Sequence, residues 1–202
     1  GAIPAILIVL LFGIVFGALQ GWFISYLNIQ PFIVTLAGMF FARGLTAVIS
    51  LEMITITNEQ FLKMAQSKIY LPFGGYVNRK GVMIYPYIYP TVVFALMVVV
   101  LAYLMLKYTK FGRSIYAVGG KEQSALLMGL NVKRTKLYVY IINGFLAALG
   151  GVAFCLNTTG AFVELARGFE MDAIAATVIG GTPLTGGVGN VYGALFGVLI
   201  KA

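Results

Sequence analysis

Residues 3–27 read IPAILIVLLFGIVFGALQGWFISYL, an apolar run without a charged side chain. As an α-helix, this run would be about 37 Å long, which is enough to cross the ~30 Å hydrocarbon core of a bilayer. It does not fit a cleavable signal peptide, because no basic stretch precedes it and it is too long for the apolar part of one. Gly13, Gly17 and Gly21 recur at every fourth position and place three small residues on one helix face. We therefore expect a membrane-spanning helix whose glycines pack closely against a neighbour, with lining of a path as the alternative.

The composition of the whole chain also indicates a lipid environment. Of its 202 residues, 60% are apolar or aromatic and 10% are charged, and the mean hydropathy is +0.95. Soluble domains carry about 25% charged residues, and one soluble core could not hide this much apolar surface. With no histidine and one cysteine, Cys155, the chain lacks the usual zinc sites, an intrachain disulfide and any Ser-His or Cys-His nucleophile pair.

Further apolar runs are long enough to cross a membrane. They occupy about 32–51, 87–106 and 137–156. Pro31 immediately precedes the first of them, a position suited to the opening turn of a helix. The segment 52–83 is mixed in polarity, and we expect it to be an extramembrane loop that contains a short helix near 59–66.

Basic residues concentrate in one connecting segment, 107–136. It holds 7 of the 14 basic residues and one acidic residue, Glu122, whereas 52–83 holds 4 basic and 2 acidic residues. Cytoplasmic connections of membrane proteins are enriched in Lys and Arg. We therefore expect 107–136 in the cytoplasm and 52–83 on the outer side. The net charge of +8 then reports orientation rather than nucleic-acid binding.

The end of the chain departs from the pattern of full-length spans. Residues 171–179, MDAIAATVI, are apolar but too short to cross, and GGTP at 180–183 and GGVG at 186–189 follow before apolar residues resume over 191–200. A short helix, a Gly/Pro break and a second helix are typical of a broken or re-entrant helix. We therefore predict an all-α integral membrane protein, a polytopic transmembrane helical bundle with a broken or re-entrant helix over about 171–200.

Four residues in the apolar segments are candidates for a pathway. Arg43 interrupts the run 32–51, and an arginine in a span is costly unless it faces protein or water. Asp172 lies at the start of 171–179, where an acidic side chain complements the helix dipole. Gly180 and Gly181 open the break that follows. A structural role is the alternative for all four: interfacial placement or ion pairing for Arg43, the helix N-terminal role for Asp172, and a helix break or packing for the two glycines.

The segment 107–136 contains TKFGRSIYAVGG at 109–120 and then a run that predicts a short helix near 122–128, with Gly129 as a candidate C-cap. Two short helices at the cytoplasmic face would offer another protein a rigid surface, and a basic loop near anionic lipid is the alternative. The Gly119-Gly120-Lys121 stretch is not a P-loop, because Ile115 replaces a required glycine and Glu122 a required Ser or Thr. We expect no cofactor in this chain, and if ATP powers this protein, another chain must bind it.

Three stretches resemble one known family. The stretch 109–120 resembles the cytoplasmic coupling region of permease subunits in bacterial ABC sugar importers of the ribose and galactofuranose type. EMDAIAATVIGGT at 170–182, with GGVG behind it, resembles a second region of this family. PFIVTLAGMF at 31–40, followed by Ala42-Arg43-Gly44, is most similar to galactofuranose-type members. The three motifs occur in the family's order and extend over most of the chain.

The resemblance implies the transmembrane subunit of an ATP-driven importer that carries a monosaccharide across the bacterial cytoplasmic (inner) membrane and is not itself an enzyme. It implies three partners: a cytoplasmic ABC ATPase, an extracytoplasmic sugar-binding protein, and a second permease copy or a homologue. We expect six residues where the permease meets the ATPase: Gly112, Arg113, Tyr116, Ala117, Gly119 and Gly120. Because 1–202 starts without methionine and stops in an apolar run, we expect a single permease domain lacking N-terminal and C-terminal parts.

Two other classes of function are alternatives, an integral membrane glycosyl or acyl transferase and a non-transporting receptor. The chain has six acidic residues, and they are scattered. Glu164 and Glu170 share one short loop, but two carboxylates close in sequence are a weak indication of acid–base catalysis. The sequence does not predict which sugar is carried, because aromatic residues such as Trp22, Phe40 and Phe41 fit helix packing better than sugar stacking.

Overall fold

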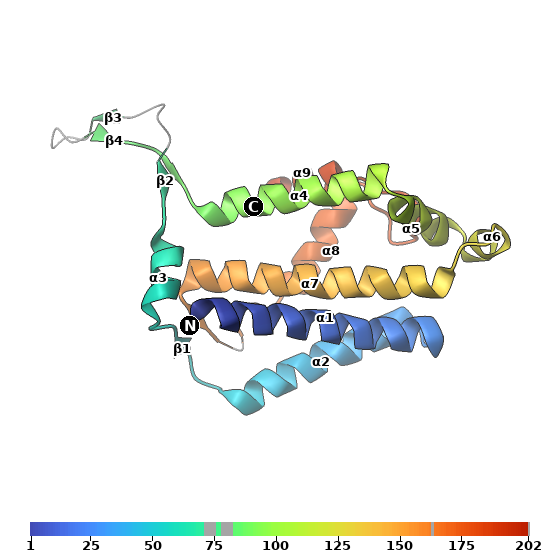
Figure 1. Cartoon of the computed structure of the whole chain (residues 1–202), viewed down its shortest axis with the longest axis horizontal. Coiled ribbons are helices and arrows are strands. Elements are labelled where there is room, and N and C mark those ends of the chain that lie inside the picture. The colour runs from blue at the N-terminus through green and yellow to red at the C-terminus, as the bar shows by residue number, and fades with distance from the viewer. Residues whose placement is uncertain (71–75, 78–82, 163, 202) are drawn as a thin grey trace.

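The computed structural model describes residues 1–70, 76–77, 83–162 and 164–201. Within these ranges the chain forms nine helices and six two-residue strands (Figure 1). The helices are α1 (Ala2–Tyr26), α2 (Pro31–Ile49), α3 (Glu59–Gln66), α4 (Pro90–Tyr108), α5 (Lys110–Gly120), α6 (Glu122–Leu127), α7 (Val132–Thr158), α8 (Phe169–Ile179) and α9 (Val191–Lys201). Helices α1, α2, α4 and α7 are long and apolar enough to cross a membrane. The predicted all-α polytopic membrane fold is confirmed.

Helices α1 and α7 lie side by side and antiparallel at the centre of the bundle (Figure 1). The glycine stripe of α1 makes this contact, since Gly13 and Gly17 lie against Gly144 of α7, and Gly21 lies against Tyr140. A Cβ atom on Gly144 would collide with the backbone of α1. Small residues let two membrane helices approach to backbone contact. The stripe therefore serves helix packing, as expected.

The two ends of the bundle carry different structures. Helices α5 and α6 lie at one end, and α3 and the strand pairs lie at the other (Figure 1). The antiparallel strand pairs are β1 (Ile54–Thr55) with β6 (Gly160–Ala161), β2 (Ile69–Tyr70) with β5 (Tyr87–Ile88), and β3 (Tyr76–Val77) with β4 (Met83–Ile84). The β1–β6 pair brings the connections after α2 and after α7 to the same end, opposite the basic segment. This placement agrees with the orientation expected from the charges. Of the expected loop 52–83, residues 71–75 and 78–82 lie outside the described residues.

Capping residues explain where several helices begin. The Asn58 side chain accepts hydrogen bonds from the first backbone N–H groups of α3, which forms where the short helix is expected. Asn131 accepts from the backbone N–H of Arg134 at 3.1 Å, so α7 begins at Val132 rather than near 137. Helix α4 begins at Pro90 rather than at 87, because residues 87–88 pair as strand β5 and proline suits the first helical turn.

The segment predicted to be broken or re-entrant forms a helical hairpin. Helices α8 and α9 each contain 11 residues, so each is about 16 Å long, roughly half of a bilayer's hydrocarbon core. They are antiparallel, because Gly180 near the end of α8 lies against Gly193, and Ala176 lies against Gly197 further along α9. Residues 180–190, here called the hairpin turn, reverse the chain between them.

Candidate functional site

The basic segment forms two short helices at one end of the bundle. The hydroxyl of Thr109 accepts a hydrogen bond from the backbone N–H of Gly112 at 3.0 Å and caps α5. Helix α6 ends at Leu127, and Gly129, just beyond it, has φ +78°. The N–H groups of Gly129 and Leu130 donate to the carbonyls of Leu126 and Ala125 at 3.0 and 3.1 Å, the pattern of a Schellman motif. Gly129 thus terminates α6 as its sequence position predicts.

The last turn of α5 lies directly on the hairpin turn. A Cβ atom on Gly187 would stand 2.5 Å from the Cα of Gly120, and one on Gly186 would stand 2.9 Å from the carbonyl oxygen of Gly119. Gly186 and Gly187 have φ of +80° and +78°, which side-chain-bearing residues rarely adopt. The contact is therefore made between two backbones, and it requires glycine at positions 186 and 187.

One side chain adds to this contact. The Tyr116 hydroxyl donates a hydrogen bond to the carbonyl oxygen of Gly189 at 3.0 Å. Tyr116, Gly119 and Gly120 together attach α5 to the hairpin turn, and we call this set of contacts the α5–turn junction. Sequence reasoning missed the junction, because it assigned the glycines of 186–189 only to a break in a helix. The available signal was two pairs of consecutive glycines, at 119–120 and at 186–187.

The remaining predicted coupling residues lie around the junction. Gly112 is buried against the backbone of Leu106, at the corner where α4 meets α5. Arg113 is exposed and Ala117 is half-buried. The structure therefore brings three of the six residues onto the hairpin turn and leaves Arg113 facing outward. Their contact with an ATPase stays a prediction.

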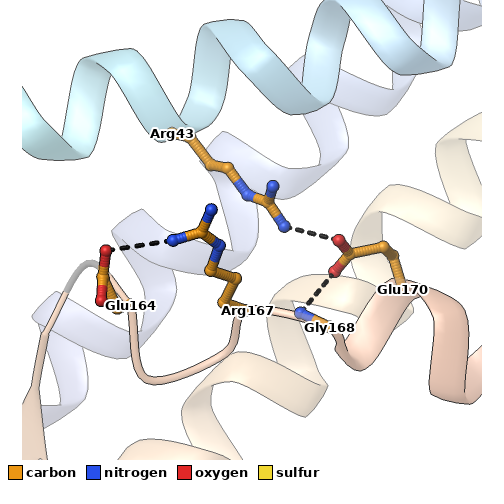
Figure 2. A network of polar contacts seen from close by, with 5 residues as sticks. All are labelled: Arg43, Glu164, Arg167, Gly168 and Glu170. Carbon is orange, nitrogen blue, oxygen red and sulfur yellow. Dashed lines mark hydrogen bonds and ion pairs between the residues drawn. The ribbon is translucent and has the colours of Figure 1, made fainter.

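A second polar site joins α2 to the start of α8. The Nη2 atom of Arg43 lies 2.6 Å from Oε1 of Glu170, and the two side chains are 35% and 34% exposed. Figure 2 shows Arg43 reaching from α2 toward Glu170, whose other carboxylate oxygen accepts a hydrogen bond from the N–H of Gly168 at 3.1 Å. In the same loop, Arg167 and Glu164 form an exposed ion pair at 3.2 Å. Arg43 is thus paired within the protein.

The partner of Arg43 was not predicted. Sequence reasoning treated Glu170 only as a neighbour of Glu164. An available signal was that Arg43 and Glu170 are charged residues within or beside apolar segments, where a cation and an acid would be drawn together. The two residues are 127 positions apart, and no local pattern indicates which acid Arg43 meets.

The other pathway candidates have structural contacts in the hairpin. Asp172 lies in the first turn of α8, as expected, and forms an ion pair with Lys201 of α9. Gly180 packs against the backbone of Gly193. Gly181 has φ +85° and ends α8 in a second Schellman motif, in which the N–H of Thr182 donates to the carbonyl of Thr177 at 3.0 Å. These contacts account for all three residues, and their part in a pathway stays a prediction.

Known proteins that resemble this chain are permeases. It is 39% identical over 194 residues to the inner membrane ABC transporter permease protein YjfF of Escherichia coli, a match that covers 96% of this chain and 55% of that protein. It is 40% identical over 208 residues to the fructose import permease protein FruG of Bifidobacterium longum, with coverage of 99% and 58%. It is 37% identical over 200 residues to the ribose import permease protein RbsC of Escherichia coli, with coverage of 98% and 59%. The chain spans somewhat more than half the length of these relatives.

These relatives confirm the resemblance to permease subunits of ribose-type ABC sugar importers, and they give no support to the transferase alternative. No solved structure was found to match the chain. A family model described as the permease component of branched-chain amino acid transport systems matches residues 2–202. Since this match extends over nearly the whole chain, the protein belongs to that permease family.

Proposed function

We propose that this chain is the transmembrane subunit of an ATP-driven importer that carries a monosaccharide across the inner membrane of a bacterium. A separate cytoplasmic ATPase binds ATP and Mg²⁺ and is coupled through the segment 107–136. An extracytoplasmic sugar-binding protein delivers the substrate, and a second permease copy or a homologue completes the membrane part. Two of the relatives are named as import permeases, one for fructose and one for ribose, and this similarity supports the proposal.

The observation that carries the proposal is the α5–turn junction. An ATPase can drive transport only if its states differ in contact free energy with the permease. Such a difference must then reach the membrane segments. Because α5 touches the hairpin turn backbone to backbone, a displacement of α5 moves the turn without first being absorbed by flexible side chains. A cytoplasmic helix is thereby attached to a half-length helical hairpin.

An outward surface beside the junction suits contact with the ATPase. Leu126, Leu127 and Met128, at the end of α6, are 64%, 88% and 67% exposed. Apolar side chains this exposed are typical of a surface that another protein covers. The α6 end and the exposed Arg113 would then bind the ATPase, and Arg113 lies one turn before Tyr116 and two turns before Gly120 on the same face of α5.

Uptake measurements test this function. The transporter that contains this chain is reconstituted in proteoliposomes with its ATPase and binding protein, and ATP-dependent uptake of ribose, fructose and xylose is followed. We expect uptake of at least one sugar by the wild type, and its loss in Arg113→Ala and Gly119→Leu. The isolated ATPase keeps its activity, because the changes lie in another chain.

Lys63→Ala provides the control. Like Arg113→Ala, it removes one positive charge, but Lys63 lies on α3 at the opposite end of the bundle. This variant should transport as the wild type does. Unchanged uptake in both the Arg113 and Gly119 variants would refute the coupling role of α5, and absence of ATP-dependent uptake of all three sugars by the wild type would count against the proposed class of substrate.

A further inference from the structure

A lysine lies among three tyrosines where α4 ends. Lys107 occupies the last turn of α4, and its Nζ atom donates a hydrogen bond to the hydroxyl oxygen of Tyr103 at 2.6 Å. The same atom lies 5.2 Å from the ring centroid of Tyr103 and 5.5 Å from that of Tyr108. The ring of Tyr103 also lies 4.5 Å, centroid to centroid, from that of Tyr192 in α9, a helix that contacts α4 (Figure 1). We call these four residues the lysine–tyrosine cluster.

The positive charge of Lys107 has no acidic partner among the described residues. The chain has six acidic residues, and four of them are paired with other basic side chains. The other two, Glu52 and Glu59, lie just before β1 and in α3, at the opposite end of the bundle. The carbonyl groups at the end of α4 supply only a partial negative charge. An ammonium group has three N–H donors, so Lys107 can bind both Tyr103 and an anion from outside the chain.

The side of α4 that carries Lys107 is apolar and exposed along its length. Val100 and Leu96 lie about two and three helical turns before Lys107, on the same side of the helix, and are 55% and 50% exposed. On α9, Phe196 lies one turn after Tyr192 and is 61% exposed. Because α4 is long and apolar enough to cross a membrane, this side lies at the depth of the hydrocarbon. Lipid acyl chains reach that depth, and a cytoplasmic protein does not.

The tyrosines suit the level of the lipid headgroups. A tyrosine ring is apolar and its hydroxyl group is polar, which favours the boundary between hydrocarbon and water. Tyr108 and Tyr192 are 64% and 45% exposed. Their hydroxyl groups and the ammonium group of Lys107 can all donate hydrogen bonds to phosphate oxygens. Anionic lipids are abundant in the cytoplasmic leaflet, and this end of the bundle is the one expected in the cytoplasm.

We propose that the lysine–tyrosine cluster binds the phosphate headgroup of one anionic phospholipid. Lys107 donates to the phosphate from α4, Tyr192 donates from α9, and an acyl chain lies over Val100 and Leu96. The bound lipid therefore lies across the contact between α4 and α9 and stabilises it. This lipid is a resident of the site and not the transported molecule, so the assignment does not depend on the proposed function.

Native mass spectrometry of the purified, assembled transporter tests the site. The complex is titrated with phosphatidylglycerol and, separately, with phosphatidylcholine, and the apparent Kd of the first bound lipid is measured. Lys107→Gln should raise the Kd of phosphatidylglycerol about fivefold, the contribution of one lysine near an anionic headgroup. Its Kd for phosphatidylcholine should stay unchanged, which also shows that the variant is folded. Lys107→Arg keeps a charge that binds phosphate and should retain the binding of phosphatidylglycerol.

Lys110→Gln is the matched control. Lys110 is exposed at the start of α5, three positions after Lys107, and the described residues give it no ring contact. Removal of its charge should therefore change the Kd of phosphatidylglycerol much less. An equal loss in both glutamine variants would show a general attraction to positive charge and would overturn the site. Unchanged binding by Lys107→Gln, or equal Kd values of the two lipids for the wild type, would also overturn it.

Two further arms identify the source of the phosphate and the occupant of the apolar side. Free glycerol 1-phosphate in excess should not displace the lipid, because it has no acyl chain to bind Val100 and Leu96. Its full displacement of the lipid would assign the cluster to a soluble phosphate and refute the lipid site. A photoactivatable phosphatidylglycerol should label α4 or α9 in the assembled transporter. Labelling only elsewhere would mean that another subunit covers this side, and the proposal would fail.

Discussion

Replacing Gly187 by alanine should open the α5–turn junction. Gly187 has φ +78°, where a residue with a Cβ atom costs about 1–2 kcal/mol. The new Cβ would also stand 2.5 Å from the Cα of Gly120, whereas carbon atoms in contact are about 3.5–4.0 Å apart. The two backbones must therefore separate by roughly 1 Å, and overpacking of this kind costs about 1–3 kcal/mol more.

Gly129→Ala is the matched control for this variant. Gly129 has the same φ of +78°, but a Cβ atom there meets no heavy atom of the described residues within 4 Å. Both variants carry the backbone cost, and only Gly187→Ala carries the collision. Thermal unfolding of the purified complex in nanodiscs should show a distinctly lower Tm for Gly187→Ala than for Gly129→Ala. Equal Tm values for the two variants would refute the argument that the junction is a tight backbone contact. Fewer sugars transported per ATP hydrolysed by Gly187→Ala would show that the junction also transmits movement.

Three further changes test other contacts. Arg43→Gln and Glu170→Gln should each reduce uptake, because each leaves a half-buried charge without its partner. Exchanging the two residues should restore part of the uptake, and strictly additive effects in a double-mutant cycle would argue against a direct pair. Gly144→Ala should destabilise the purified protein by about 1–3 kcal/mol by forcing α1 from α7, while Gly150→Ala on the same helix should be close to neutral in thermal unfolding. Tyr116→Phe should weaken the junction by about 0.5–1.5 kcal/mol and lower the ratio of uptake to ATP hydrolysis, and an unaltered ratio would show that this hydrogen bond plays no part in coupling.

Features that depend on neighbouring residues could be predicted from the sequence. The four long helices follow from long apolar runs, because a bilayer leaves few other ways to satisfy the backbone. Helix ends follow from Gly129 and from the proline and asparagine caps, although strand β5 and Asn131 shift two helix starts by several residues. The glycine spacing of α1 indicates a packing face, but the sequence does not name α7 as its partner.

Features that join distant parts of the chain could not be predicted. Tyr116 and Gly189 are 73 positions apart, and their hydrogen bond depends on how the hairpin folds back. The reversal between α8 and α9 depends on glycines of two helices meeting, which a single sequence does not reveal. Arg43 and Asp172 stand out as charged residues in apolar segments, but their partners Glu170 and Lys201 emerge only from the tertiary structure.

The two attachments of the α8–α9 hairpin differ in how they respond to salt. The α5–turn junction is made of uncharged backbone and one neutral hydrogen bond, so dissolved ions scarcely affect it. The attachment of α8 to α2 is a partly exposed ion pair, and at physiological ionic strength charges are screened over about 8 Å. Because the two charged atoms are 2.6 Å apart, well inside that length, rising ionic strength should weaken the Arg43–Glu170 attachment only modestly, and the α5–turn junction still less. The hairpin is thus held at its turn by contacts that ions leave unchanged, and at its start by one whose strength depends on them.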